Sequence, residues 1–338
     1  MIALGIDTHK HTHTVVALTH LGELVGEFQI ETTSVGYRQF ISCLSQFGDD
    51  EIKIGIEGAG AWGAGLCQAL QADGYAVFEV ERPTRKDRSR GKSDRIDALA
   101  AAQTVLSGRG LSTPRQGGMR RALACVLVAY RSEIQERTRL RNQIQSLAVT
   151  APPCLRERIG HGTGAKLECR LAHLRSGARA SSEERVVFDV LRSLAKRSRE
   201  LGRAAQAHEK QMSALVAQLD PTLLDEYGVG PVCAAKLLVA DPRRFRCESA
   251  FARSNGTAPL EASSGKTVRH RLSRRGDRQV NNAIHTIALI RSVHHPESRA
   301  YLERRISEGK TRKEAMRALK RQISRRLYKR ICAGGLTL

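Results

Sequence analysis

Three stretches decide the architecture of the first hundred residues: "IALGID" (2–7), "HTVVALT" (13–19) and "ELVGEFQIE" (23–31). All three contain β-branched and other apolar residues, and short polar connectors separate them. Such runs favour strands, and connectors of this length favour tight turns between neighbouring strands. We therefore expect a three-stranded meander at the start of the chain.

Helical and strand-like segments alternate after the predicted meander. Apolar spacing typical of helices occurs in 34–47 and 61–74, while strand-like runs occupy 52–58 and 75–80. Ser93 is a good N-cap for one more helix, because its hydroxyl can accept a bond from a free backbone N–H. The resulting order, β-β-β-α-β-α-β-α, is typical of an α/β fold of the RNase H-like kind.

Charge is distributed unevenly along the chain. The formal net charge is +22 and the isoelectric point is near 10.3. Residues 1–100 carry a net charge of −4, whereas residues 101–338 carry +26. A protein this basic usually has a polyanionic partner such as nucleic acid. We therefore assign residues 1–112 to a domain that does chemistry and expect the rest of the chain to bind phosphate.

Residues 113–220 are predicted to form a long helical arm. A heptad register with 4-3 spacing covers ten positions, of which eight are apolar: Val187, Leu191, Leu194, Ser198, Leu201, Ala205, His208, Met212, Leu215 and Leu219. Sustained heptads predict a coiled coil, and 123–147 is predicted to be a second long helix. The pattern fits either an antiparallel arm or a dimer seam. Ser198 and His208 are interpreted as tolerated polar positions.

Residues 221–338 are predicted to form a small, mainly α domain with a basic tail. "YGVGPVCAAKLL" (227–238) is similar to a helix-hairpin-helix element, in which the turn at Gly228 and Gly230 would present backbone amides to a phosphate. A plain helical turn is the alternative. The segment 303–330 adds 12 Lys and Arg residues against three acids, which again favours nucleic acid as the partner.

Four acidic residues stand at positions that surface solubility does not explain well. Asp7 ends the first predicted strand, Glu57 ends the fourth, and Asp94 and Asp97 share one face at the start of a helix. Asp94 and Asp97, taken alone, would be ordinary acidic residues at the start of a helix. In an RNase H-like sheet, however, the two strand ends and this helix converge. Four close carboxylates need cations, and Mg²⁺ prefers such oxygen ligands and supports phosphodiester chemistry.

The motifs that carry these acids resemble a known family. "GIDTHK" (5–10), "IEGAG" (56–60) and "KSDRIDA" (92–98) are similar to the Asp-Glu-Asp-Asp pattern of bacterial insertion-sequence transposases with a RuvC-like N-terminal domain, the insertion-sequence one-ten family. One departure is Gly58, which stands where a less flexible small residue is common.

A second pair of motifs extends the resemblance to the C-terminal part of the chain. "GTAPLEASSGK" (256–266) and "RLSRRGDRQVNNAIH" (271–285) are similar to the C-terminal signature of the same family. The resemblance covers nearly the whole chain, although the arm 117–220 matches in helical character alone.

The resemblance implies a DNA transposase or recombinase with a particular chemistry. Asp7, Glu57, Asp94 and Asp97 would hold Mg²⁺, and Ser264 would attack the scissile phosphate. The products would be a phosphoserine link and a free 3′-hydroxyl, which permit strand exchange. The family also implies a noncoding (bridge) RNA that guides donor and target DNA, and a homo-oligomer, either dimer or tetramer.

The residues around Ser264 support this interpretation without deciding it. A serine beside a flexible glycine and among cations suits attack on a phosphodiester, but a plain loop in a DNA-binding surface is the alternative. The resemblance selects Ser264 over Ser263, because Ser264 directly precedes Gly265. The cations expected to bind nucleic acid are Lys266, Arg269, Arg271, Arg274, Arg275 and Arg278.

Two other functions remain open at this stage. A RuvC-like, structure-selective endonuclease of the Holliday-junction type would use the same four carboxylates with water as the nucleophile. A decayed transposase would bind nucleic acid without cleaving it. Ser264 and its basic loop are the features that a water-dependent endonuclease does not need.

Several smaller features complete the predictions. His9, His11 and His13 are interpreted as one solvated strand face, because Mg²⁺ prefers oxygen ligands. Lys10 fits a phosphate contact or a packed stem equally well. Eight cysteines without a Cys-x-x-Cys pair and no run of about 18 apolar residues predict a reduced, cytosolic protein with no membrane partner. The resemblance implies that this cytosol is bacterial.

Overall fold

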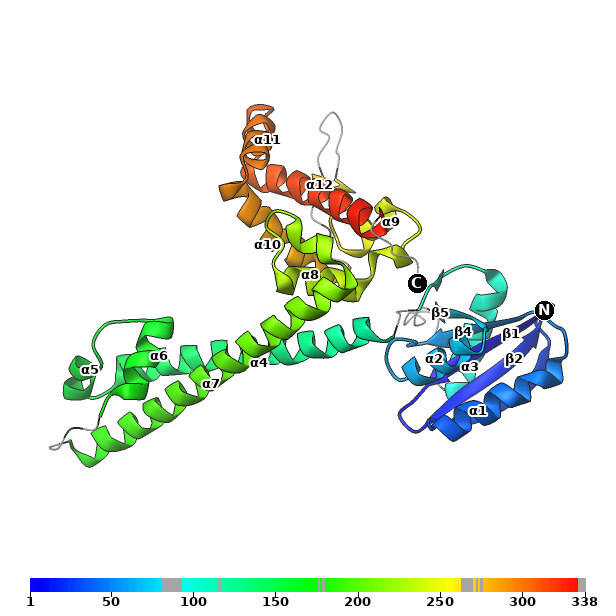
Figure 1. The fold of residues 1–338 in the computed structure, drawn as a ribbon, viewed down its shortest axis with the longest axis horizontal. Coiled ribbons are helices and arrows are strands. Elements are labelled where there is room, and N and C mark those ends of the chain that lie inside the picture. Colours follow the sequence, from blue (N-terminus) through cyan, green and yellow to red (C-terminus); the bar gives the residue numbers. More distant parts are fainter. Residues whose placement is uncertain are drawn as a thin grey trace. The chain divides into compact units, whose positions relative to one another are not determined.

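A central sheet and a set of long helices belong to two separate compact units of the chain (Figure 1). The computed structural model describes residues 1–80, 93–114, 117–175, 177, 180–262, 270–271, 273 and 276–333. The first unit comprises Met1–Gly118 and Asp241–Ala250, and the second comprises Met119–Ala240 and Phe251–Leu338.

The first unit is built on a six-stranded sheet with the strand order β3-β2-β1-β4-β5-β6. Its strands are β1 (Ile2–Thr8), β2 (Thr12–Thr19), β3 (Leu24–Glu31), β4 (Ile52–Glu57), β5 (Ala76–Val80) and β6 (Leu111–Ser112). The first three strands pair antiparallel, which confirms the predicted meander. β4 pairs parallel with β1 and with β5, and β6 is a short antiparallel edge that the sequence pattern did not predict.

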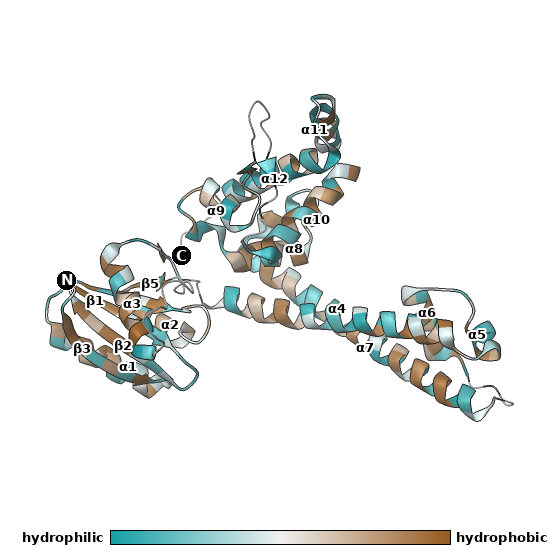
Figure 2. Cartoon of the chain, turned by 180° about the vertical axis from the view of Figure 1, so that it is seen from behind, coloured by the Kyte–Doolittle hydropathy of each residue, from teal (hydrophilic) through white to brown (hydrophobic). Residues whose placement is uncertain are grey.

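Helices cover both faces of this sheet. Side chains alternate along a strand, so Leu4 and Ile6 of β1 join the core beneath α1 (Ser34–Cys43) and α2 (Ala64–Ala72). The opposite face packs against α3 (Asp94–Ser107). Figure 2 shows the strands of the sheet in brown, as expected for a sheet buried between two helical layers. The order of strands and helices is the mixed α/β order that the sequence predicts.

A segment from later in the chain completes the first unit. Residues Asp241–Ala250 belong to it and begin with a short 3-10 helix, η3 (Pro242–Arg244). The guanidinium of Arg244 pairs with Glu79 of β5 and donates to the carbonyl of Thr113. These contacts hold the segment to the edge of the sheet.

Two long helices dominate the start of the second unit. α4 (Met119–Thr150) and α7 (Ser182–Leu219) pack against each other and run in opposite directions (Figure 1). Two short helices lie between them in the chain, α5 (Pro153–Ile159) and α6 (Gly164–His173). The sequence pattern did not predict α5 or α6, because each is too short to show a clear apolar period.

The buried column of α7 differs in part from the predicted heptad register. Its buried residues recur with heptad spacing at Phe188, Leu191, Ala195, Ser198, Gly202, Ala205, Met212 and Val216. Alternate predicted positions, such as Val187 and Leu194, instead lie at the margin of the column. Four of the ten predicted positions, Leu191, Ser198, Ala205 and Met212, belong to the buried column, and the other six are half-buried beside it. Spacing alone cannot separate two neighbouring columns when both contain apolar residues.

The two polar residues of the predicted seam take part in specific polar contacts. Ser198 is fully buried and donates to Glu168 of α6, which also accepts from Arg141 at 2.6 Å and 3.0 Å. The Nδ1 atom of His208 lies 2.9 Å from a carboxylate oxygen of Glu133. The interpretation of Ser198 and His208 as merely tolerated was therefore wrong, because both satisfy buried or half-buried acids.

The rest of the second unit is mainly helical, as predicted. From residue 221 onward the chain forms η2 (Pro221–Asp225), α8 (Pro231–Ala240), α9 (Glu248–Ser254), the hairpin strands β7 (Leu260–Glu261) and β8 (His270–Arg271), α10 (Arg278–His294), α11 (Pro296–Ser307) and α12 (Arg312–Ala333). Within the described ranges, no helix has the length and apolarity required to cross a membrane.

Candidate active site

Two buried carboxylates lie side by side at the ends of the central strands. Asp7 is near the end of β1 and Glu57 is the last residue of β4; their exposed fractions are 6% and 8%. The strands pair parallel with Ile6 opposite Ile56, so the next residue of each strand points to the same face. That face is the one covered by α3.

A glycine allows α3 to approach this face closely. A Cβ atom added at Gly5 would lie 2.1 Å from the carbonyl oxygen of Ala98 and 2.1 Å from the amide nitrogen of Ala102. No side chain fits in that space, so the backbone of α3 rests directly on β1. The first turn of α3 is thereby positioned over the strand ends.

The first turn of α3 supplies the other two acids. Ser93 caps the helix as predicted, and its Oγ accepts from the amide of Ile96 at 3.2 Å. Asp94 and Asp97 follow in this turn, where the partial positive charge of the helix N-terminus favours acids. Asp94 is exposed and Asp97 is half-buried.

A turn glycine fixes the direction of the chain after Glu57. Gly58 has a left-handed φ of +71°, a conformation that costs glycine little. The hydroxyl of Thr8 donates to the carbonyl of Glu57 at 2.8 Å and ties the two strand ends together. The flexible residue at position 58 is therefore explained by the tight turn that begins there.

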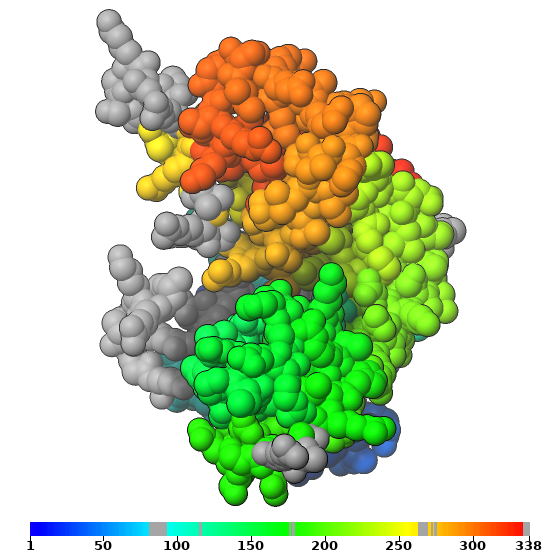
Figure 3. Space-filling model, turned by 90° about the vertical axis from the view of Figure 1, so that its left-hand side faces the viewer, coloured from blue at the N-terminus to red at the C-terminus, as the bar shows by residue number. Residues whose placement is uncertain are grey.

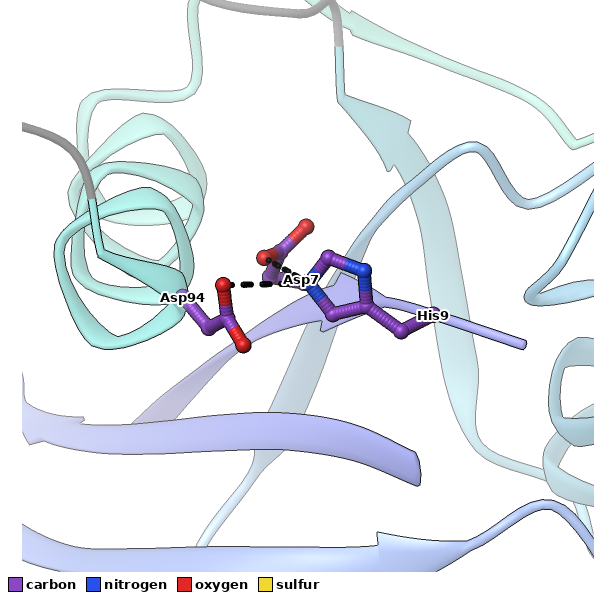
Figure 4. A group of neighbouring side chains, drawn as sticks. All are labelled: Asp7, His9 and Asp94. Atoms are coloured by element: carbon purple, nitrogen blue, oxygen red, sulfur yellow. Dashed lines mark hydrogen bonds and ion pairs between the residues drawn. The ribbon is translucent and has the colours of Figure 1, made fainter. Parts of the chain in front are cut away.

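A histidine joins the acids, which the sequence pattern did not predict. The Nε2 atom of His9 lies 3.1 Å from Asp7 Oδ2 and 3.2 Å from Asp94 Oδ1 (Figure 4). One ligand atom from each of these three residues lies within 4.8 Å of the other two. This spacing is short enough for a single metal ion to contact all three.

The electrostatics of Asp7 connect all four predicted carboxylates. Burial is the largest influence and raises the pKa of Asp7, while the nearby imidazole of His9 acts in the opposite direction. The negative charges of Glu57, Asp97 and Asp94 raise the pKa of Asp7 further. Nearby negative charges disfavour the ionised form of Asp7, and a bound divalent cation would reverse this effect. The donor set thus fits a hard metal ion that binds carboxylate oxygens.

The three N-terminal histidines do not form one solvated face. His11 is exposed, but His13 is fully buried on the other side of the sheet, where its ring stacks on Tyr37 at a centroid distance of 6.0 Å. Burial lowers the pKa of His13, so its neutral form is favoured. The predicted solvated face was wrong because His13 lies within β2 and His9 turns toward the acids. Lys10 lies exposed between β1 and β2.

Part of the predicted C-terminal site lies outside the described residues. This applies to Ser263, Ser264, Lys266, Arg269, Arg274 and Arg275. Arg271 belongs to β8 and Arg278 begins α10, and both are exposed. In the intervening segment, Asp277 caps α10 by accepting from the amides of Gln279 and Val280.

The predicted helix–Gly-Val-Gly–helix element has a different form. The first predicted helix is the five-residue 3-10 helix η2. Gly228 has a left-handed φ of +79° and faces Ile287 and Ile290 of α10, so this side of the turn is occupied by a helix. Gly230 is exposed just before α8, and it is therefore the more accessible of the two glycines.

Comparisons with known proteins agree on one family. A family model described as "Transposase", whose name refers to a DEDD motif and to IS110, matches residues 4–153. A second model, described as the transposase IS116/IS110/IS902 family, matches residues 221–303. The first match includes all four carboxylates, and the second includes the position of Ser264.

A curated relative points in the same direction. The "Insertion element IS110 uncharacterized 43.6 kDa protein" of Streptomyces coelicolor is 34% identical over 138 residues, which are 39% of this chain and 34% of that protein. The match thus spans about a third of the length of that relative. With two models of the same family matching in the expected order, the chain belongs to the IS110 family of transposases.

Proposed function

We propose that the chain is a DNA transposase that cleaves and exchanges DNA strands with Mg²⁺ bound at Asp7, Glu57, Asp94 and Asp97. One arrangement carries the proposal: Asp7 and Glu57 are buried at the ends of neighbouring parallel strands, and His9 lies 3.1 Å from Asp7 and 3.2 Å from Asp94 of the helix above them. These acids lie within the segment that matches the transposase family. Such clustering of carboxylates is costly for stability alone and is typical of metal-dependent phosphodiester chemistry.

The proposed architecture has three parts. Residues 1–112 form a RuvC-like catalytic domain, which the strand order and the position of the acids at strand ends support. Residues 113–220 form a coiled-coil arm made of α4 and α7, supported by the heptad spacing of buried residues on α7. Residues 221–338 form the C-terminal transposase domain with the serine nucleophile.

In the proposed reaction, the hydroxyl oxygen of Ser264 attacks the phosphorus of the scissile phosphodiester. The hydroxyl of Ser264 loses its proton to solvent as its oxygen bonds to phosphorus. The bond from phosphorus to the 3′-oxygen breaks, the phosphate stays on Ser264, and the 3′-oxygen takes up a proton from solvent, so the proton count is unchanged. Bound Mg²⁺ would stabilise negative charge that develops on phosphate oxygens. Asp7 and Glu57 would hold the ion in a fixed place, because both side chains are buried and their strands are tied by the hydrogen bond from the Thr8 hydroxyl to the carbonyl of Glu57.

The partners that we propose follow from charge and from the family. Donor and target DNA would bind the basic C-terminal part, to which the exposed Arg271, Arg278 and Gly230 contribute. A noncoding guide RNA would select the two DNA sites, and a homo-oligomer would bring the serine of one subunit to the acids of another. The net charge of +26 in residues 101–338 supports binding of more than one polyanionic partner.

The covalent intermediate provides the test of this function. A nicked DNA substrate incubated with the chain, the guide RNA and Mg²⁺ should yield a DNA–protein adduct that survives denaturant and disappears on protease treatment. Ser264→Ala should abolish both adduct and cleavage. Ser263→Ala is the matched control and should keep both, because the neighbouring hydroxyl is not the nucleophile.

The same experiment distinguishes the alternative function. A RuvC-like endonuclease of the Holliday-junction type would use water and would release protein-free ends. Normal cleavage by Ser264→Ala without any adduct would therefore exclude the serine transposase and favour the endonuclease. Loss of cleavage in Asp7→Asn is expected under both functions and does not separate them.

A further inference from the structure

A basic cavity lies within the second unit, next to the β7–β8 hairpin. Its volume is about 470 Å³, within the range of about 300–1,000 Å³ of small-ligand pockets. The hairpin, the turn at 256–259, α11 and α12 surround it. The ionisable groups that line it are Arg271, Arg305, Lys310, Arg317, Lys320, Arg321 and Arg325, with the acids Glu308 and Glu314 and with His270. Figure 3 shows the orange surface of α11 and the start of α12 beside the yellow residues before the hairpin loop.

Both acids of the cavity are engaged at its rim. Glu308 accepts from Arg305 at 2.8 Å. Glu314 accepts from the amide of Thr311 at 2.9 Å, where it caps α12, and lies 3.8 Å from Arg317. These contacts leave the cavity with a large excess of positive charge, which is suited to an anionic ligand.

Lys320 is the most unusual group in this cavity. Its exposed fraction is 8%, and its ammonium donates to Asn281 Oδ1 at 2.8 Å. Burial lowers the pKa of Lys320, and no carboxylate of the described part of the chain pairs with it. An ammonium has three donors, and a buried charge without a counter-ion is costly. A bound anion would remove this cost.

A hydrogen-bond network holds the ammonium of Lys320 in place. Asn281 on α10 donates to the carbonyl of Asn255 at 2.6 Å, which fixes the orientation of its own carbonyl toward Lys320. Asn255 in turn donates to Ser324 of α12 at 3.0 Å and accepts from Thr257. Three separate segments therefore position one cation, as is expected for a preorganised binding site.

Two planar groups on the wall of the cavity, Tyr301 and Arg305, suit a nucleobase. Tyr301 lies in α11, with the guanidinium groups of Arg304 and Arg305 at 5.5 Å and 5.3 Å from its ring centroid. Aromatic rings and guanidinium planes both stack on bases, and such stacking tolerates any base. The cavity thus offers a cation for a phosphate and a planar group for a base, which together match one nucleotide.

We propose that this cavity binds one nucleotide of the DNA strand being cleaved, with its phosphate at Lys320 and its base at Tyr301. The proposal rests on the proposed function, because β7 and β8 flank in sequence the segment that contains Ser264. Arg271 of β8 lines the same cavity and would contact a neighbouring phosphate. The site would hold the strand beside the hairpin whose two strands flank Ser264 in sequence.

Binding of a short oligonucleotide tests the site without any cleavage. The probe is a trideoxynucleotide that carries 5-iodouracil, titrated into full-length Ser264→Ala chain without Mg²⁺ and then photocrosslinked. We expect the crosslink to map to Tyr301 by mass spectrometry. Lys320→Met should weaken binding about tenfold or more, because it removes a charge-assisted contact. Failure of the proposed cleavage chemistry would leave this result unchanged.

Matched variants decide whether the effect belongs to the cavity. Lys313→Met removes an exposed lysine of the same helix that does not line the cavity, and it should bind the probe like the parent. Arg271→Gln on the exposed hairpin should also weaken binding and provides a second test if Lys320→Met fails to fold. Equal affinity of all variants, or crosslinks only elsewhere, would overturn the site. Tighter binding of the matching ribonucleotide would overturn its assignment to DNA.

Discussion

Two buried carboxylates, Glu226 in the second unit and Asp7 in the first, have opposite surroundings. Glu226 accepts from Arg291 at 3.0 Å, from Arg326 at 3.0 Å and from Arg330 at 3.1 Å. Burial acts to raise the pKa of Glu226, but the hydrogen bonds and charges of these arginines outweigh it and lower the pKa. Asp7 faces other acids, and its pKa is raised.

The difference separates a structural charge from a functional one. Around Glu226 the chain supplies the counter-charges itself, so this carboxylate is paired once the chain has folded. Around Asp7 the chain places three more carboxylates and one imidazole, so the negative charge remains in excess. Lys320 is the cationic counterpart, because among the described residues it has the neutral Asn281 as a hydrogen-bond partner and no carboxylate. Excess charge in a buried place indicates where a ligand of opposite charge completes the structure.

Substitution of Asp7 should have the largest effect on activity. Asp7→Asn keeps the shape of the side chain but removes one negative charge from the metal site. We expect DNA cleavage in Mg²⁺ to fall at least about a thousandfold, while binding of nucleic acid in filter or anisotropy assays stays near that of the parent. Asp73→Asn, at an exposed helix end, is the control. Cleavage near the parental rate would mean that Asp7 is not a metal ligand.

Substitution of Glu226 should have the largest effect on stability. Glu226→Gln leaves the buried Arg291, the half-buried Arg330 and the exposed Arg326 without their common carboxylate. We expect the free energy of unfolding to fall by about 3–5 kcal/mol, chiefly because the buried Arg291 loses its counter-charge. Asp7→Asn should instead leave the free energy of unfolding measured without metal unchanged or raise it, because the substitution removes repulsion between carboxylates. Urea unfolding of both variants without metal measures the contrast. Equal losses in the two variants would remove the distinction between the sites.

The pH dependence of the Glu226 network follows from the lowered pKa. Its ion pairs contribute fully above the unfolded pKa of about 4.3, and the contribution is lost as the pH falls through the lower folded pKa. The stability difference between the parent and Glu226→Gln should therefore be constant near neutral pH and shrink below about pH 4. A difference that grows on acidification would contradict the lowered pKa.

Substitution of Gly5 should have a smaller effect on stability, and it tests whether the packing of α3 on β1 positions the acids of the site. Gly5→Ala places a methyl group against the backbone of α3, and overpacking of this kind costs about 1–3 kcal/mol. Displacement of α3 would also move Asp94 and Asp97, so Mg²⁺ affinity should fall. Gly162→Ala, where an added Cβ would make ordinary contacts, is the control. Calorimetric titration with Mg²⁺ that shows unchanged affinity in Gly5→Ala would mean that close packing of α3 does not position the acids.

Much of the fold of the first unit could be predicted from local patterns. Strand β1 and its neighbours show long apolar runs, and Ser93 is a clear helix cap, so the order of elements followed from the sequence. Asp7 and Glu57 could be predicted as site residues because acids at the ends of apolar strands lack a simple structural explanation. The two-residue strand β6 has no such pattern and was missed.

Tertiary neighbours explain most of what the sequence could not predict. His9 meets Asp94 across 85 positions of chain only because α3 folds back over β1. Lys320 is one of many lysines in a basic tail, and its burial becomes visible only once α10 places Asn281 beside it. The heptad column of α7 was ambiguous because two neighbouring columns were apolar. The periodicity of apolar residues predicts which face of a helix or strand is buried, but not which residues that face contacts.

Thermal unfolding of the full chain with and without Mg²⁺ tests the central claim most directly. A ligand at 100 times its dissociation constant stabilises the folded state by about 2.7 kcal/mol. We predict that Mg²⁺ raises the unfolding temperature of the parent and of Asp73→Asn but not that of Asp7→Asn. Glu226→Gln should unfold at a lower temperature yet keep the full shift with Mg²⁺. An equal shift in Asp7→Asn, or no shift in the parent, would contradict a metal site at these carboxylates.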